Sequence, residues 1–319
     1  MTEGFVGRTG ERDRLRTAVT GVVGGWGGGI WIDGGAGLGK SRLLTECLGA
    51  DATGWARAGE TSPAEPFGAV LACLDDAAPA RPDLAVAGSL LRSLRANPPR
   101  LGPVLRQFRR AARNQPIILV LDDLHRADDA SLQVWAQLHR VARTDPLLLV
   151  SAARPVAHPG LDAAHTTAAA GGTPTISLVP LTEGEATTLA YACGHHPHVV
   201  DAAVRDAGGN PAYLRMLADG RGEPPPALRA LVTEHLSTLT ERTRRTLTLL
   251  AQSPPGASAV DLAARGRRVL GDLRSDLNEA LHAAVLISTG GTAGFRHPIV
   301  RRVLRMPRRR GTSSSVPRH

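Results

Sequence analysis

Long apolar runs are missing from this 319-residue sequence, and no stretch approaches the roughly 20 residues that a membrane-spanning helix needs. The first fifteen residues are charged and lack the apolar core of a signal peptide. Cysteine is also scarce, and Cys47, Cys73 and Cys193 lie too far apart for a CxxC pair or a zinc-ligand pattern. We therefore expect a cytoplasmic protein with free thiols and no membrane partner.

Lysine is almost absent. Lys40 is the only lysine among 38 basic residues, and the other 37 are arginine. The bias indicates that arginine has replaced lysine wherever either cation serves. The surviving lysine therefore marks a position where arginine is a poor substitute.

Acidic residues are missing from the C-terminal end. Residues 296–319 contain eight arginines and no Asp or Glu, whereas residues 1–295 contain 30 basic and 29 acidic residues. The net charge of +9 therefore belongs almost wholly to the end of the chain, and the body gives no argument for nucleic-acid binding. Residues 307–319 are rich in Arg and Ser, and we expect a disordered basic tail there.

Apolar runs that suit buried strands alternate with helical patterns over the first 180 residues. The expected strands lie near residues 30–33, 54–58, 117–123, 147–152 and 175–179. Such alternation predicts an α/β domain with a parallel sheet flanked by helices. From residue 183 the pattern is helical, and a leucine stripe, a short hairpin and a further helix follow the Gly/Pro-rich residues 222–226.

The sequence GGAGLGKS at residues 34–41 matches the phosphate-binding pattern GxxxxGK[ST] between a predicted strand and a predicted helix. Glycines let the backbone aim its N–H groups at phosphate oxygens, and the helix presents its positive N-terminal end to the same anion. Lys40 reaches the β- and γ-phosphates, and Ser41 ligates Mg²⁺. We assign nucleotide binding to Gly35, Ala36, Gly37, Leu38, Gly39, Lys40, Ser41 and Arg42.

Two acidic residues end the apolar run at residues 117–121. Asp122 stands where a Walker B aspartate holds Mg²⁺, and Asp123 is placed to orient or deprotonate the attacking water. The alternative is that both carboxylates only end a strand and cap a helix. Arg154 follows the next predicted strand, where it either contacts the γ-phosphate or is an ordinary surface arginine.

An ordered series of motifs carries a family resemblance. The motifs are FVGR (residues 5–8), GGAGLGKS, LVLDDLHRADDASL (119–132), LLLVSAARP (147–155), LVPLTEGEA (178–186), GGNPAYL (208–214) and FRHPIVRRVL (295–304). The series resembles the ATPase region of STAND-type signalling NTPases in the AAA+-like group. It is most similar to the N-terminal part of large ATP-binding LuxR-type transcriptional regulators of actinobacteria.

The resemblance implies four parts. They are a P-loop NTPase domain (residues 1–180), a small helical domain (181–222), a winged-helix-like domain (223–306) and the tail (307–319). It also implies ATP or ADP and Mg²⁺ as ligands, self-association in the ATP state, and a regulator or signalling protein as partner.

The resemblance assigns further nucleotide contacts. Phe5, Val6 and Arg8 lie near the adenine, Pro211 lies over the base, and His297 corresponds to a winged-helix histidine that contacts the ADP β-phosphate. The alternatives are core packing for Phe5 and Val6, a helix-start proline at position 211, and a structural histidine at position 297. The sequence departs from the family at Arg126, where tryptophan is usual, and at its end, since the usual helical repeats and helix-turn-helix do not follow.

Three functions remain open on the sequence. The first is a slowly hydrolysing ATP switch of a STAND-type regulator that lacks the usual repeat and helix-turn-helix output regions. The second is a DNA-binding AAA+-like regulator or initiator that uses the winged helix and the basic C-terminus. The third is a catalytically idle nucleotide-binding fragment.

Overall fold

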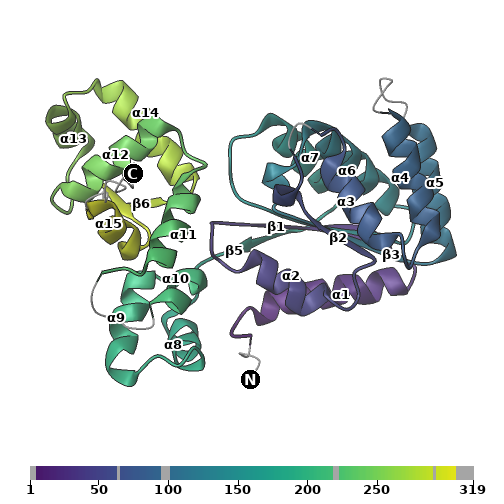
Figure 1. Ribbon diagram of the computed structural model, residues 1–319, viewed down its shortest axis with the longest axis horizontal. Helices are drawn as coiled ribbons and strands as arrows, with labels where there is room; N and C mark the ends of the chain where they lie inside the picture. Colours follow the sequence, from purple (N-terminus) through teal and green to yellow (C-terminus); the bar gives the residue numbers. More distant parts are fainter. Residues whose placement is uncertain (1–4, 63–64, 95–100, 218–222, 290–291, 307–319) are drawn as a thin grey trace, which may run out of the picture. The chain divides into compact units, whose positions relative to one another are not determined.

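The computed structural model describes residues 5–62, 65–94, 101–217, 223–289 and 292–306 (Figure 1). Its contacts divide the chain into two compact units, Met1–Ala192 and Cys193–His319. No helix among the described residues is long and apolar enough to cross a membrane. The tail predicted for residues 307–319 lies outside the described part of the chain.

The first unit contains a sheet of five parallel strands, which confirms the predicted α/β fold. The strands are β1 (Gly28–Gly34), β2 (Gly54–Arg57), β3 (Ile117–Asp122), β4 (Leu147–Ala153) and β5 (Thr175–Leu178), in the spatial order β2-β3-β4-β1-β5. The strand β4 therefore lies between the strand that precedes the GGAGLGKS loop and the strand that ends in Asp122.

Ten helical segments accompany this sheet in the described part of the first unit. They are α1 (Thr9–Val23), α2 (Lys40–Leu48), η1 (Ala58–Glu60), α3 (Gly68–Ala77), α4 (Pro82–Leu94), α5 (Gly102–Asn114), η2 (Leu124–Arg126), α6 (Asp129–Ala142), α7 (Pro159–Ala170) and α8 (Glu183–Ala192). The helices α1 and α2 cover one face of the sheet, and α3 to α7 cover the other.

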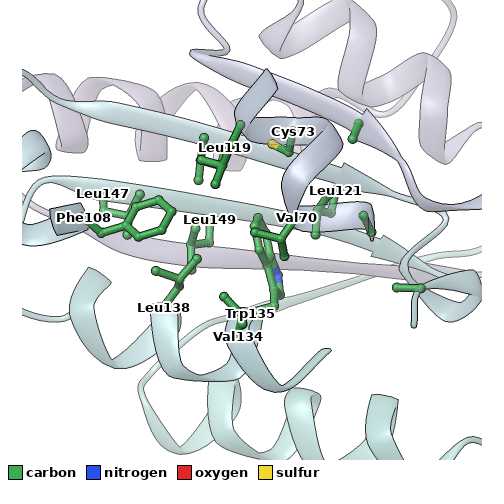
Figure 2. Packing of buried hydrophobic residues seen from close by; sticks show 14 of the residues in the cluster. Val70, Cys73, Phe108, Leu119, Leu121, Val134, Trp135, Leu138, Leu147 and Leu149 are labelled. Carbon is green, nitrogen blue, oxygen red and sulfur yellow. The ribbon is translucent and has the colours of Figure 1, made fainter. Parts of the chain in front are cut away.

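Alternate residues of the central strands enter two separate apolar clusters, one on each face. Leu119 and Leu121 of β3 join the cluster built with α3, α5 and α6, whereas Ile118 and Val120 join the cluster built with α1 and α2. Figure 2 shows the first cluster, where Trp135 of α6 packs against the sheet. Side chains on a strand alternate between the two faces of the sheet. A strand that is covered on both faces therefore has a continuous run of apolar residues in its sequence.

The second unit is built mainly of helices. It contains α9 (Pro197–Ala207), α10 (Pro211–Met216), α11 (Pro226–Leu236), α12 (Glu241–Gln252), α13 (Ala259–Gly266), α14 (Leu270–His282), β6 (Leu286–Thr289), β7 (Thr292–Phe295) and α15 (Pro298–Arg305). The strands β6 and β7 pair in antiparallel fashion. The predicted leucine stripe lies on α14, where Leu273 and Leu277 are buried.

The order of these elements is the order predicted for a winged helix, and that assignment remains a prediction. The finer domain boundaries expected at residues 180, 222 and 306 also remain predictions. In the structure, α8 is grouped with the first unit rather than with the helices that follow it.

Candidate functional site

The carboxyl ends of the parallel strands bring the predicted catalytic residues to one edge of the sheet. The strand β1 runs into the GGAGLGKS loop, β3 ends at Asp122, and Arg154 directly follows β4. The strand β2 ends at Arg57, which pairs in register with Asp122. Open α/β sheets bind their ligands outside this edge.

The GGAGLGKS loop turns sharply between β1 and α2. Gly37 and Gly39 have φ angles of 76° and 92°, in the left-handed region that favours glycine. Gly39 is the N-cap of α2 and makes no side-chain cap. Because the first N–H groups of a helix lack intrahelical partners and point outward, this turn has the geometry of an anion site.

Lys40 is buried at this turn, with 6% of its surface exposed. Its ammonium donates hydrogen bonds to the backbone oxygens of Gly34 at 2.7 Å and Gly35 at 3.0 Å. Burial lowers the pKa of Lys40 to about 8, and the charge of Arg154 acts in the same direction. The carboxylates of Asp123, Asp122 and Asp33 oppose this shift. Arg154 and the two carboxylates after β3 therefore lie within electrostatic reach of the ammonium.

Asp122 is fully buried at the end of β3. Its Oδ1 accepts a hydrogen bond of 2.8 Å from the backbone N–H of Asp123, whereas its Oδ2 has no hydrogen-bond partner among the described residues. Asp123 has a left-handed φ of 53°, which is uncommon for a residue other than glycine. A buried carboxylate oxygen that accepts no hydrogen bond suits a hard cation such as Mg²⁺. The Ser41 hydroxyl remains the other oxygen that the sequence predicts for this ion.

Arg57 is a neighbour of these carboxylates that the sequence did not reveal. Its Nε lies 3.6 Å from Asp122 Oδ2 and 4.0 Å from Asp123 Oδ2, and its guanidinium also pairs with Glu60 at 3.5 Å. The side chain is 46% exposed. The only sequence signal was its position at the end of a predicted strand, because the pairing of β2 with β3 joins segments far apart in the chain.

The FVGR segment contacts the part of the chain that follows β5. The Arg8 side chain is buried and donates to the backbone oxygen of Val179. Gly7 has a φ of 72°, in the left-handed region that favours glycine, and a Cβ there would meet the flexible end of the Glu185 side chain. The predicted adenine contacts Phe5 and Val6 are half-buried, and Phe5 packs against the apolar cluster that α1 and α2 form with the sheet.

Pro211 and His297 belong to the second unit, where the structure brings their segments together. Pro211 is the first residue of α10, and His297 precedes α15. The Nδ1 of His297 lies 3.0 Å from the backbone oxygen of Ala207, and its ring packs edge-on against Tyr213. Burial lowers the pKa of His297 to about 4. The contact of either residue with a nucleotide remains a prediction.

Comparisons with known proteins agree with this description. Residues 4–150 match the AAA ATPase domain family. The fold is similar to that of a Walker-type ATPase of Pyrococcus abyssi, at 16% identity over 96% of this chain and 97% of that chain, with a TM-score of 0.69. It is also similar to the ORC2 protein of Aeropyrum pernix, solved in ADPNP and ADP complexes, at 15% identity over 93% of both chains, with a TM-score of 0.56.

A third structure is a STAND protein with a tetratricopeptide repeat sensor from Pyrococcus horikoshii. It matches at 18% identity with a TM-score of 0.47, over 94% of this chain and 42% of that chain. The present chain thus spans less than half the length of that protein. No curated protein sequence matches this chain. The resemblance to LuxR-type regulators stays a prediction.

The match of residues 4–150 includes the GGAGLGKS loop, Asp122 and Asp123. These residues meet at the carboxyl edge of a parallel sheet that is flanked by helices on both faces. The stretch that holds these residues thus matches the AAA ATPase domain family, and the fold of the chain is similar to that of a Walker-type ATPase.

Proposed function

We propose that this chain is a STAND-type nucleotide switch that binds ATP and hydrolyses it slowly to ADP and phosphate. One observation carries the proposal: the only lysine of the sequence is buried in a Gly-rich turn, within electrostatic reach of Asp122 and Asp123 at the end of β3. The buried ammonium of Lys40 and the buried carboxylate of Asp122 are costly to maintain unless a ligand uses them.

The loop and Lys40 bind the phosphates. Backbone N–H groups of residues 35–42 donate to phosphate oxygens at the start of α2. The Lys40 ammonium exchanges its bonds to the Gly34 and Gly35 oxygens for bonds to the β- and γ-phosphates. Because the lysine already lies in the turn, little rearrangement is needed when the nucleotide enters.

Ser41 and Asp122 are the residues that would hold Mg²⁺ when a nucleotide is bound. The hydrogen-bond-free Oδ2 of Asp122 supports this assignment. Groups of three or more His, Cys, Asp or Glu suited to a metal are absent from the described residues. A magnesium ion on a nucleotide needs no such group, since it keeps several waters and takes phosphate oxygens as ligands. When bound, the ion neutralises charge on the phosphates.

Asp123 and Arg154 act on the terminal phosphate. Asp123 accepts a proton from water as the water oxygen bonds to the γ-phosphorus, while the bond from that phosphorus to the bridging oxygen breaks and ADP leaves. The Arg154 guanidinium stabilises the charge on the transferred group. Both residues follow the ends of neighbouring strands, which supports their action on one group.

The protein acts as a switch because it retains the product ADP, which holds it in a closed state until ATP replaces it. By resemblance, Phe5, Val6 and Arg8 lie near the adenine, Pro211 lies over the base, and His297 contacts the β-phosphate. The Nδ1 of His297 is directed at the Ala207 oxygen, so its Nε2 is the atom that faces a ligand. A contact made only with ADP in the closed state biases the equilibrium towards that state.

Asp123→Asn is the test of hydrolysis. We expect turnover of ATP to fall about 100-fold, because the amide cannot accept the proton of the attacking water. Affinity for ADP stays within about threefold of wild type, since the carboxylate has no role in binding the diphosphate. Phosphate release and calorimetric titration measure the two quantities. Equal turnover by the variant and the wild-type protein would contradict the role of Asp123, and no turnover by the wild-type protein would support an idle nucleotide-binding domain.

Arg57→Ala tests the contact between β2 and the Walker B carboxylates. The Arg57 guanidinium competes with Mg²⁺ for Asp122 Oδ2. An exposed ion pair contributes up to about 1 kcal/mol, so its removal should lower the Mg²⁺ concentration for half-maximal ATP binding by about two- to fivefold. Arg57→Lys, which keeps the charge, serves as the control. An unchanged or raised Mg²⁺ requirement in the alanine variant would contradict this competition.

The second unit supports DNA binding less well. In a winged helix the third helix enters the major groove, and here that position falls to α14. Arg274 is the single arginine of this helix. Its acidic residues are used within the unit, where Asp276 is buried against Arg242 and Arg268 and Asp272 pairs with Arg242. Contacts with phosphates dominate the affinity of proteins for DNA, and a helix with a single arginine makes few of them. Such a helix is poorly suited to bind in the major groove. We therefore do not extend the proposed function to DNA.

A further inference from the structure

His125 is a buried residue of the site that the mechanism above does not use. It lies in η2, two residues after Asp123, and only 8% of its surface is exposed. Its Nδ1 accepts a hydrogen bond of 3.4 Å from the backbone N–H of Arg154. A neutral imidazole carries its proton on the other nitrogen when Nδ1 is an acceptor, so Nε2 is the N–H of this ring.

The Nε2 atom is buried and has no hydrogen-bond partner in the described part of the chain. A buried donor left without an acceptor costs on the order of 1–3 kcal/mol. Native structures contain few such groups, and each calls for an explanation, such as a ligand that completes the bond. The donor therefore points to an acceptor that arrives from outside the chain.

The charges around the ring indicate the chemistry of that acceptor. Burial lowers the pKa of His125 to about 4. Asp123 opposes this shift, whereas Arg154, Lys40 and then Arg126 reinforce it. The ring is therefore a neutral donor at physiological pH, and the cations near it favour an anionic oxygen.

The neighbours of His125 also indicate which oxygen it binds. Asp123 precedes it by two residues, and the Arg154 backbone fixes its Nδ1. These are the two residues assigned above to the attacking water and the γ-phosphate. We propose that the Nε2–H of His125 donates a hydrogen bond to an oxygen of the terminal phosphate of bound ATP, and so distinguishes ATP from ADP. The proposal rests on the proposed nucleotide site.

Two substitutions test the two ring nitrogens of His125 separately. His125→Asn keeps a polar oxygen near the Nδ1 position, where it accepts from Arg154, and removes the distant donor. His125→Gln places an amide N–H near the Nε2 position. Calorimetry with Mg²⁺ and either ADP or a non-hydrolysable ATP analogue measures both affinities. We expect the Asn variant to bind the analogue about tenfold more weakly and ADP unchanged. The Gln variant should stay within about threefold of wild type for both ligands.

The wild-type protein provides a second measurement, in which a variant serves only to assign one signal. The Nε2 proton of His125 should give a downfield, exchange-protected proton NMR signal, assigned by its absence from the Gln variant. We expect that signal to shift with the analogue and not with ADP.

An equal loss of affinity for both nucleotides in the Asn variant, or no loss, would overturn the proposal. An Nε2 signal that responds equally to both nucleotides would do the same. Wild-type protein that binds neither nucleotide would instead refute the proposed function.

Discussion

Lys40→Ala is expected to reduce the affinity for ATP and ADP by about 1,000-fold or more, which abolishes binding at ordinary concentrations. A charge-assisted hydrogen bond contributes about 1.5–3 kcal/mol, and the ammonium is proposed to make such bonds to two phosphate groups. No second lysine exists in the sequence to compensate. Calorimetric titration of both nucleotides in the presence of Mg²⁺ measures the change. A dissociation constant for ADP within tenfold of wild type would contradict the assigned role.

Lys40→Arg is the matched control, because it keeps the charge and changes the shape of the cation. The planar guanidinium is wider than an ammonium and presents its donors in a rigid fork. The space at Lys40 is set by hydrogen bonds of 2.7 and 3.0 Å to the turn itself. We expect the arginine variant to lose most of the affinity as well. Wild-type binding by this variant would show that charge alone explains the retained lysine.

The low pKa of Lys40 adds a pH dependence in the wild-type protein. Burial lowers this pKa to about 8, so the free protein loses the Lys40 proton as the pH rises through that value. Only the protonated ammonium binds phosphate strongly. The dissociation constant for ADP should therefore be constant below about pH 7 and rise up to tenfold per pH unit above pH 8. The Lys40→Ala variant should lack this dependence.

The sequence predicts the strand and the turn that form the site better than it predicts which other segments lie beside them. The apolar run at residues 117–121 followed by two carboxylates identified β3, and the glycine pattern identified the turn before α2. Both signals are local, since burial on two faces and backbone turning act on consecutive residues. The order of the strands is not local. The contact of Arg57 with Asp122 depends on β2 lying beside β3, and no pattern in either strand specifies that pairing.

The buried polar residues show the same limit. In the sequence, His125 is only one residue of a motif. The sequence alone predicts neither its burial nor the orientation of its two ring nitrogens. For His297 the sequence allows either a ligand contact or a structural role. The structure accounts for its Nδ1 by the oxygen of Ala207, whereas its role towards a nucleotide stays a proposal. Such assignments need the packing of segments that are about 30 to 90 residues apart.

Asp128 is expected to be the side chain on which the stability of the first unit depends most strongly. It caps α6, with Oδ1 accepting from the backbone N–H of Ser131 at 2.8 Å. The same oxygen accepts from the backbone N–H of Phe67 at 2.8 Å, where α3 begins without a cap of its own. One buried carboxylate thus serves two helix N-termini, both of which favour a negative charge.

Asp128→Ala should lower the free energy of unfolding of the first unit by about 3–5 kcal/mol. The change removes the acceptor of several buried donors, including the Ser131 hydroxyl at 2.6 Å, and leaves them unsatisfied. Asp128→Asn keeps one oxygen for the two backbone donors, and we expect a loss of about 1–2 kcal/mol. All four tryptophans of the sequence, at positions 26, 31, 55 and 135, lie in the first unit. Tryptophan fluorescence during urea unfolding therefore reports this unit.

The neighbouring residue supplies the control for this prediction. Asp129 belongs to the same motif, but its side chain is 77% exposed and its charged contact, with His158, is at 4.0 Å. Asp129→Ala should change the free energy of unfolding by less than about 0.5 kcal/mol. If the two alanine variants were equally stable, Asp128 would not join the two helices energetically. A larger loss at Asp128 would show that the motif after the Walker B carboxylates holds α3 and α6 together.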